Sequence, residues 1–122
     1  MPTPNDALRD RLSRSSEIDI TVTGRKSGSA ISNPIWFVLD KEKDKLYLLP
    51  VQGSDTQWYK NVLTNPSFRI DARGAQGDFQ AVPITDAARV SHVVEKFRKK
   101  YGANDVKKYY SKLDVAVLAQ AQ

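Results

Sequence analysis

Apolar and polar residues alternate near the start of the chain with the period of a half-buried β-strand. Ile18, Ile20 and Val22 are each followed by a polar residue. The glycine-bounded segment 24–29 predicts a turn, and the β-branched and aromatic residues of segment 31–39 predict a second strand. The two strands are therefore expected to form a hairpin.

A buried strand and a short helix are predicted next. Segment 46–49 predicts a strand that ends at Pro50, because proline cannot donate to a strand ladder. Ser54 or Asp55 is a suitable cap for a short helix. This helix carries four apolar or aromatic residues, which are Trp58, Tyr59, Val62 and Leu63. Asn65-Pro66 ends it, since the residue before proline disfavours helical torsions.

Two more strands complete the middle of the chain. Apolar residues alternate with charged residues over 68–73, and a further strand is predicted over 79–84. Gly74 and Gly77 mark the turn between these strands. The middle of the chain is therefore expected to consist of strands except for one short helix.

The period changes near the C-terminus. Apolar residues over 86–101 follow the i, i+3, i+4, i+7 spacing of an amphipathic helix. Asp86 suits its N-cap, and Gly102 suits the position just after its end. A second short helix is predicted over 105–110 and a last strand over 113–119.

The N-terminal residues 1–14 predict a helical arm. A short helix is expected over 5–14, with Asn5 or Asp6 as its cap and with Leu8 and Leu12 on one face.

The strand pattern predicts the fold class. Six short strands at hairpin spacings favour an antiparallel sheet that curls into a small barrel, because closure removes exposed edges. Strands and helices do not alternate, so the fold is predicted to be α+β, with the long helix covering one side or end of the barrel. At 122 residues the chain is expected to form a single domain over 1–122.

Composition excludes several classes of protein and site. No apolar run is long enough to cross a bilayer, which excludes an integral membrane segment. The N-terminus lacks a secretory signal pattern, so a cytoplasmic location is expected. The chain has no cysteine and one histidine, which excludes disulfides, thiolate sites and a His-rich metal site. No metal is predicted.

The chain is basic, which raises the question of an anionic partner. Lysine and arginine number 19 against 14 acidic residues, giving a net charge of +5. Many of these basic residues fall on one late segment: Lys96, Arg98, Lys99, Lys100, Lys107, Lys108 and Lys112. A helix C-terminus favours cations in any case, and charge alone also serves solubility. We therefore predict no nucleic-acid partner.

Gly24-Arg25-Lys26-Ser27-Gly28 is the sharpest local feature. Flanking glycines allow backbone N–H groups to point outward, Arg25 offers a planar fork of donors, and Lys26 and Ser27 add a charge and a hydroxyl. This set suits a phosphate or a carboxylate. The spacing is not that of a P-loop, and a basic hairpin turn with no ligand remains an alternative.

Aromatic residues supply the other candidate surfaces. Trp58 and Asn61 lie three residues apart on one helix face, where they suit a planar, hydrogen-bonding ligand, although these residues alone favour burial of Trp58 and Val62 against the barrel. Trp36 and Phe37 are expected to face opposite sides of a strand, one in the core and the other at a groove or interface. The pair Tyr109-Tyr110 is ambiguous in the same way.

No catalytic residue is assigned from the sequence. The carboxylates are spread through turns without an acid–base pair, and His92 is expected to face solvent. If the protein is an enzyme, a bound cofactor carries its reaction.

Four segments in order resemble the deazaflavin-dependent nitroreductase family, within the flavin/deazaflavin oxidoreductase superfamily. These segments are Ile18 to Gly28, Pro34 to Phe37, Leu46 to Pro50 and Trp58 to Pro66. The resemblance runs from about residue 15 to the closing 113–117 strand. It implies a split antiparallel β-barrel with flanking helices, similar to pyridoxamine phosphate oxidases, that forms a homodimer.

The resemblance also implies a cofactor and its contacts. Coenzyme F-420, a deazaflavin, is expected to pass a hydride to a small organic acceptor. The implied phosphate or tail contacts are Arg25, Lys26 and Ser27. The implied ring contacts are Pro34, Ile35, Trp36, Pro50, Val51, Gln52 and Gly53, with Trp58 and Asn61 closing the site. Segment 29–33 lacks the basic residues that many members carry there, so FMN, another anionic ligand or a non-catalytic role stays open.

Overall fold

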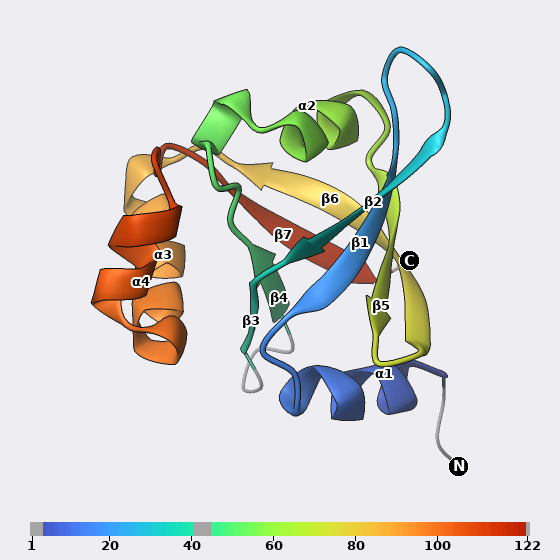
Figure 1. Ribbon diagram of the computed structural model, residues 1–122, viewed down its shortest axis with the longest axis horizontal. Helices are drawn as coiled ribbons and strands as arrows, with labels where there is room; N and C mark the ends of the chain where they lie inside the picture. The colour runs from blue at the N-terminus through green and yellow to red at the C-terminus, as the bar shows by residue number, and fades with distance from the viewer. Residues whose placement is uncertain (1–3, 41–44, 122) are drawn as a thin grey trace.

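The computed structural model describes residues 4–40 and 45–121. Helices and strands follow in the order α1 (Pro4–Ser13), β1 (Ile18–Thr23), β2 (Ala30–Ile35), β3 (Phe37–Asp40), β4 (Lys45–Leu48), η1 (Gly53–Asp55), α2 (Gln57–Thr64), β5 (Ser67–Ala72), β6 (Ala75–Ile84), α3 (Ala87–Tyr101), α4 (Ala103–Tyr109) and β7 (Ala116–Ala121). Figure 1 shows a curled sheet with α1 at one end, α2 at the other and the α3–α4 pair beside it.

The sheet confirms the predicted α+β class. Within the described residues it has seven strands in the order β2-β1-β5-β6-β7-β4-β3, and every neighbouring pair is antiparallel. The edge strands β2 and β3 are consecutive in the chain, so the sheet curls back on itself as a half-barrel (Figure 1).

The predicted strand over 31–39 is wrong as one element, because it divides at Trp36. β2 pairs with β1, with Ile35 opposite Ile18, whereas β3 pairs with β4, with Phe37 opposite Leu48. The chain thus changes pairing partner at Trp36, which belongs to neither strand. This break accounts for the seventh strand.

The β5–β6 turn is tighter than predicted. Arg73 and Gly74 alone form it, with φ of 54° and 91°. Gly77 lies inside β6 opposite Ile70. A Cβ on Gly77 would lie 2.6 Å from Leu8 Cδ2, so the glycine makes room for α1 to pack on the sheet.

Several helix and strand ends differ from the predicted ones. α1 begins at Pro4, so Asn5 and Asp6 lie inside the helix instead of capping it. α4 begins two residues earlier than predicted. β7 begins at Ala116 instead of residue 113, because residues 111–114 contact the loop that follows β4.

The long helix α3 is confirmed together with both of its ends. The Arg89 N–H donates to Asp86 Oδ2 at 3.0 Å, which makes Asp86 the N-cap, and Gly102 follows the helix with φ of 96°. The buried face of α3 packs with β-sheet and α4 residues in a second core cluster. His92 is exposed on the outer face, as expected.

Candidate functional site

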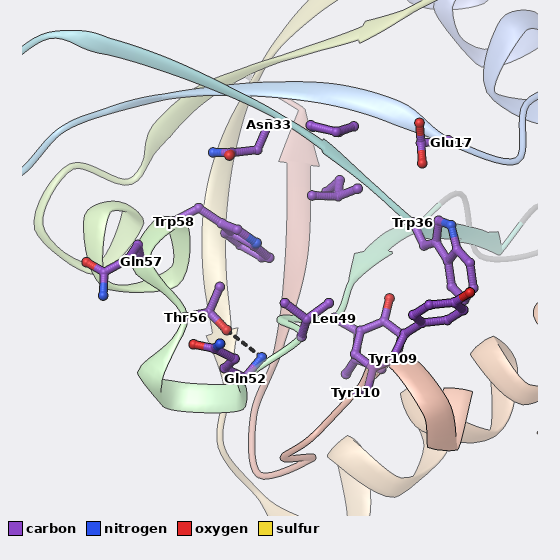
Figure 2. Close-up of a pocket in the computed structure, with 13 residues that line it drawn as sticks. Glu17, Asn33, Trp36, Leu49, Gln52, Thr56, Gln57, Trp58, Tyr109 and Tyr110 are labelled. Atoms are coloured by element: carbon purple, nitrogen blue, oxygen red, sulfur yellow. Dashed lines mark hydrogen bonds between the residues drawn. The ribbon is translucent and has the colours of Figure 1, made fainter. Parts of the chain in front are cut away.

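A cleft of about 580 Å³ opens between the end of β2, the β4–α2 loop and the end of α4 (Figure 2). Its lining comes from four separate parts of the chain: Glu17, Asn33, Pro34, Ile35, Trp36, Leu49, Val51, Gln52, Thr56, Gln57, Trp58, Tyr109 and Tyr110. Most of these side chains are aromatic, aliphatic or neutral amides. The cleft therefore suits a planar ligand with hydrogen-bonding edges.

Trp36 forms one wall of the cleft. Its ring stacks on Tyr101 with centroids 4.2 Å apart and planes 7° apart, and Tyr109 meets it edge-on at 5.5 Å. Phe37, its neighbour, is fully buried in the core. The prediction that one of these aromatics is core and the other faces a groove is confirmed.

Tyr101 fixes the strand break that places Trp36. The Phe37 N–H donates to Tyr101 Oη at 3.1 Å, and this hydroxyl lies 2.8 Å from both the Phe37 and Ser16 carbonyl oxygens. Burial raises the pKa of Tyr101 to about 12, so the hydroxyl keeps its proton in alkaline solution where an exposed tyrosine ionises. The backbone groups freed by the change of strand partner are thus satisfied by α3.

Lys100 reaches the same strand break from α3. Its Nζ donates to the Phe37 carbonyl at 2.8 Å and lies 3.5 Å from the centroid of the Phe37 ring. Much of the side chain is exposed, but its ammonium is held against the ring and the backbone. Desolvation lowers the pKa of Lys100 to about 8.

Trp58 and the start of α2 form the facing wall. Trp58 is only 6% exposed, so it serves both the core and the cleft. The predicted caps Ser54 and Asp55 instead form the short η1 turn, and Thr56 is the residue before α2. Thr56 Oγ1 accepts from the Gln52 N–H at 2.8 Å, which fixes the loop ahead of the helix (Figure 2).

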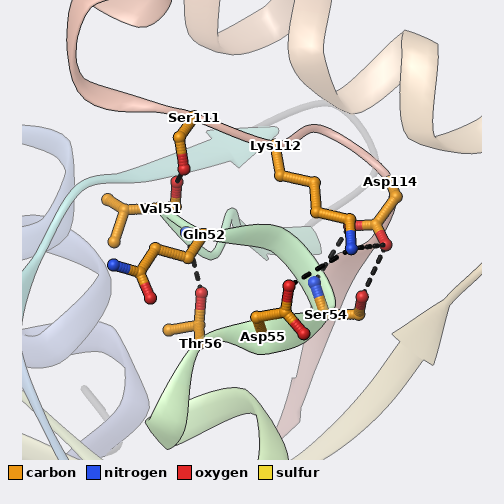
Figure 3. A network of polar contacts seen from close by, with 8 residues as sticks. All are labelled: Val51, Gln52, Ser54, Asp55, Thr56, Ser111, Lys112 and Asp114. Atoms are coloured by element: carbon orange, nitrogen blue, oxygen red, sulfur yellow. Dashed lines mark hydrogen bonds and ion pairs between the residues drawn. The ribbon is translucent and has the colours of Figure 1, made fainter.

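Two loops are joined by a network of polar contacts, which Figure 3 shows. Asp114 accepts from the Ser54 N–H at 2.9 Å and from Ser54 Oγ at 2.6 Å. Lys112 Nζ lies 3.3 Å from Asp55 Oδ2, and the Ser111 N–H donates to the Val51 carbonyl at 2.8 Å. We call this network, from Val51 to Asp55 and from Ser111 to Asp114, the loop clasp.

Gly53 lets the loop clasp close. Its φ is 55°, and a Cβ at this position would lie 2.1 Å from Asp114 Oδ1. Burial opposes ionisation of Asp114, but the hydrogen bonds from Ser54 outweigh it and lower the pKa of that carboxyl. The clasp links the wall that carries Val51 and Gln52 to the chain just after Tyr110.

The basic turn contacts α2 beside the cleft. The Arg25 N–H and Nη1 both donate to Asn61 Oδ1, at 3.1 and 2.8 Å. Arg25 Nη2 donates to Gln57 Oε1 at 2.8 Å, and Gln57 lines the cleft. Two of the four segments that carry the sequence resemblance are therefore in direct contact, although Arg25 and Asn61 are 36 residues apart.

Half of the twelve residues expected to contact a cofactor line the cleft: Pro34, Ile35, Trp36, Val51, Gln52 and Trp58. The others lie around it. Arg25 and Asn61 form the contact just described, Lys26 and Ser27 are exposed on the turn, Pro50 is buried and Gly53 belongs to the loop clasp.

Sequence reasoning missed several lining residues. Tyr109 and Tyr110 were singled out only as an ambiguous aromatic pair, and Glu17, Asn33, Leu49, Thr56 and Gln57 were not singled out at all. A polar side chain beside a strand end is not distinctive in one sequence. Only the fold brings these positions together.

Ionisable groups are few in the lining. Glu17 is its one carboxylate among the residues that the structure describes. Tyr110 is 5% exposed, and burial followed by the nearby Tyr101 raises the pKa of its hydroxyl. In the described part of the chain no cluster of potential ligands suits a metal ion, and no helix there is long and apolar enough to cross a membrane.

Solved structures share this fold at low sequence identity. A structure described as a domain-swapped dimer has a TM-score of 0.67 and 19% identity, over 97% of this chain and 100% of the other. An F-420-H2-dependent reductase has a TM-score of 0.66 and 21% identity, over 86% and 94%. The heme storage protein HutZ from Vibrio cholerae has a TM-score of 0.70 and 12% identity, over 99% and 92%. These likenesses identify the split-barrel fold.

Sequence comparison gives the family. No curated protein matches the sequence. A family model described as "Uncharacterized protein conserved in bacteria" (DUF2255) matches residues 9–118. Because this match spans most of the chain, the protein belongs to that family.

Proposed function

We propose that the protein is an oxidoreductase that binds coenzyme F-420 in the cleft and passes a hydride to a small organic acceptor. The observation that carries this proposal is the connection between an aromatic cleft and a basic turn through one residue, Gln57. A ligand with a planar ring and an anionic tail needs both surfaces side by side. The F-420-dependent relative in the same fold supports this choice.

The chemistry of the cleft fits a deazaflavin ring. Its volume of about 580 Å³ lies within the roughly 300–1,000 Å³ of small-molecule sites. Trp58 and Trp36 offer aromatic surface, and Asn33, Gln52 and Gln57 offer neutral donors and acceptors. These groups suit the carbonyl and N–H edges of the ring without imposing a charge.

The basic turn would hold the anionic part of the cofactor. Both described side-chain partners of Arg25 are neutral amide oxygens, so its positive charge is not compensated by a carboxylate there. Lys26 and Ser27 are exposed beside it. Charge-assisted hydrogen bonds from such groups to phosphate or carboxylate are strong.

The residues of this chain would bind, orient and shield, while the reduced deazaflavin supplies the hydride when it is bound. Trp36 and Trp58 would fix the plane of the ring, and the loop clasp would keep the walls at a constant distance. Burial raises the pKa of the Tyr110 hydroxyl further above neutral pH, so this group is a neutral donor in the cleft. A hydride transfer controlled by position needs no acid–base pair, which agrees with the sparse charge of the lining.

We also propose that the protein works as a homodimer. Val51 and Tyr109 lie at the cleft with 44% and 52% of their surface exposed. A second copy would cover this apolar surface and complete the cleft. The likeness to a domain-swapped dimer supports an assembly of two chains.

FMN and a non-catalytic role with another anionic ligand are the alternatives, since FMN shares the planar ring and the phosphate. The test is to titrate the protein separately with F-420, FMN and hemin and to measure binding from the quenching of its tryptophan fluorescence. Because Trp36 and Trp58 line the cleft, a ligand that binds there should quench their fluorescence. We expect the lowest Kd for F-420. Tighter binding of FMN or hemin, or no quenching by F-420, would overturn the cofactor assignment.

A further inference from the structure

Asn61 is the most deeply buried polar residue beside the basic turn, with 4% of its surface exposed. Its Oδ1 accepts two hydrogen bonds, both from Arg25: one from the backbone N–H and one from Nη1. The same amide therefore fixes the turn backbone and the direction of the guanidinium. Asn61 is outside the cleft lining, so its contacts point to a role through Arg25.

We infer that Asn61 is a positioning residue, which holds the Arg25 guanidinium in place as a charged anchor for a polyanionic ligand. The inference rests on the proposed function for the identity of that ligand. Gln57, one turn before Asn61 in α2, also holds Arg25 by accepting from its Nη2. Asn61 and Gln57, which share one face of the helix, thus hold Arg25 by hydrogen bonds.

The side-chain partners of Arg25 are neutral amides, and carboxylates in their place would cancel the positive charge of the guanidinium. Asp and Glu are the usual partners of a structurally fixed arginine, and they cancel its charge. An amide oxygen accepts the same hydrogen bonds and leaves the full positive charge available. The described ion pairs include none with Arg25. The arrangement gives a rigid cation that is ready for an anion.

Arg25 also keeps donors for that anion. A guanidinium has five N–H groups, and two side-chain hydrogen bonds are made to α2. Lys26 is exposed next to it. A ligand with several negative oxygens would meet both residues without displacing Arg25 from Asn61.

The test uses Asn61→Asp, which keeps the shape and the acceptor oxygen but places a negative charge beside the Arg25 guanidinium. Tripolyphosphate is the probe, and the NMR shifts of the Arg25 to Ser27 amides report its binding. We expect the affinity to fall at least about tenfold while the amides of Arg25 and its neighbours keep their folded dispersion. Unchanged affinity would mean that Arg25 does not anchor the anion, because the variant keeps the acceptor oxygen and changes only the charge beside the guanidinium.

Two further variants sharpen the test. Gln57→Glu adds the carboxylate at an exposed position, and we expect a several-fold loss of affinity in the same direction even if Asn61→Asp fails to fold. Asn104→Asp makes the same chemical change on the exposed surface of α4, and we expect a change of less than about twofold there.

The outcomes separate this inference from the proposed function. Unchanged tripolyphosphate affinity in Asn61→Asp and Gln57→Glu, or no binding to the parent protein, would overturn the role of Asn61. Charge-sensitive tripolyphosphate binding together with no F-420 binding would support the role of Asn61 and contradict the cofactor assignment.

Discussion

At the scale of single residues, Lys100 has an unusual environment whose consequence depends on pH. Its ammonium lies against the Phe37 ring, and desolvation lowers its pKa from 10.5 to about 8. Between these two values the unfolded chain binds more protons than the folded chain. The contribution of this group to stability therefore rises as the pH increases through that window.

We expect Lys100→Met to flatten this pH dependence. Urea unfolding of the parent and the variant at pH 7 and pH 9.5 measures the change. The parent should gain stability relative to Lys100→Met at the higher pH. An identical pH response in both proteins would mean that the Lys100 ammonium is fully hydrated.

Gly53 and Gly28 offer a matched pair of substitutions. Both have positive φ, but a Cβ at Gly28 meets nothing within 4 Å, whereas at Gly53 it collides with Asp114 and Lys112. Gly28→Ala should cost about 1 kcal/mol from backbone strain alone. Gly53→Ala should cost about 3 kcal/mol or more, because the loop clasp must also open. Equal losses in the free energy of unfolding, measured with urea, would show that the loop clasp opens at little cost in stability.

Some site residues were predicted from the sequence because their own chemistry marks them, whereas contacts between distant segments were not. Trp36 and Trp58 were singled out as large aromatics on a predicted strand and a predicted helix, and the resemblance then implied that both contact the cofactor. The Arg25–Asn61 contact was not found, since it joins two motifs across 36 positions. Glu17 carries no local signal that distinguishes it from any other exposed carboxylate.

At the scale of elements, period-2 and period-3.6 patterns were sufficient to find every long strand and helix. The predicted ends of strands are wrong where a tertiary contact determines where the strand ends. Segment 31–39 has the composition of one strand, but Tyr101 satisfies the backbone at Phe37 and allows the chain to change partner. Gly77 resembles a turn residue, yet it serves α1 packing inside β6.

The break at Trp36 gives a prediction about an element junction. Tyr101→Phe keeps the stacked ring and removes the hydroxyl, so the Phe37 N–H loses its acceptor. We expect a loss of about 1–3 kcal/mol and a shift in Trp36 fluorescence as that wall loosens. A Trp36→Phe background identifies the fluorescence change as that of Trp36. Unchanged stability would indicate that water replaces the hydroxyl at no cost.

At the scale of the whole molecule, an antiparallel half-barrel was predictable because hairpin spacings and alternation agree along the chain. The cleft was less predictable, since four distant segments form it. Its open side carries exposed Val51 and Tyr109, which one chain does not cover.

The proposed homodimer is tested by light scattering at micromolar concentration. We expect the mass of two chains for the parent and a shift toward one chain for the double variant Val51→Ser/Tyr109→Ser, because the covering contact would lose apolar area. Leu63→Ser, at another exposed apolar residue, is the control. A monomer mass for the parent contradicts the proposed assembly.

The central claim is that the basic turn and the aromatic cleft bind one ligand together. Arg25 contacts α2, so replacing it with alanine also costs stability, whereas Lys26 is exposed. The most direct measurement is the Kd of F-420 for the parent, for Lys26→Ala and for the double variant Arg25→Ala/Lys26→Ala, each verified as folded from its melting curve. We predict a stepwise loss that reaches at least about tenfold in the double variant, since each charge-assisted hydrogen bond contributes roughly 1.5–3 kcal/mol before non-additivity. A folded double variant that binds F-420 as tightly as the parent would contradict the claim.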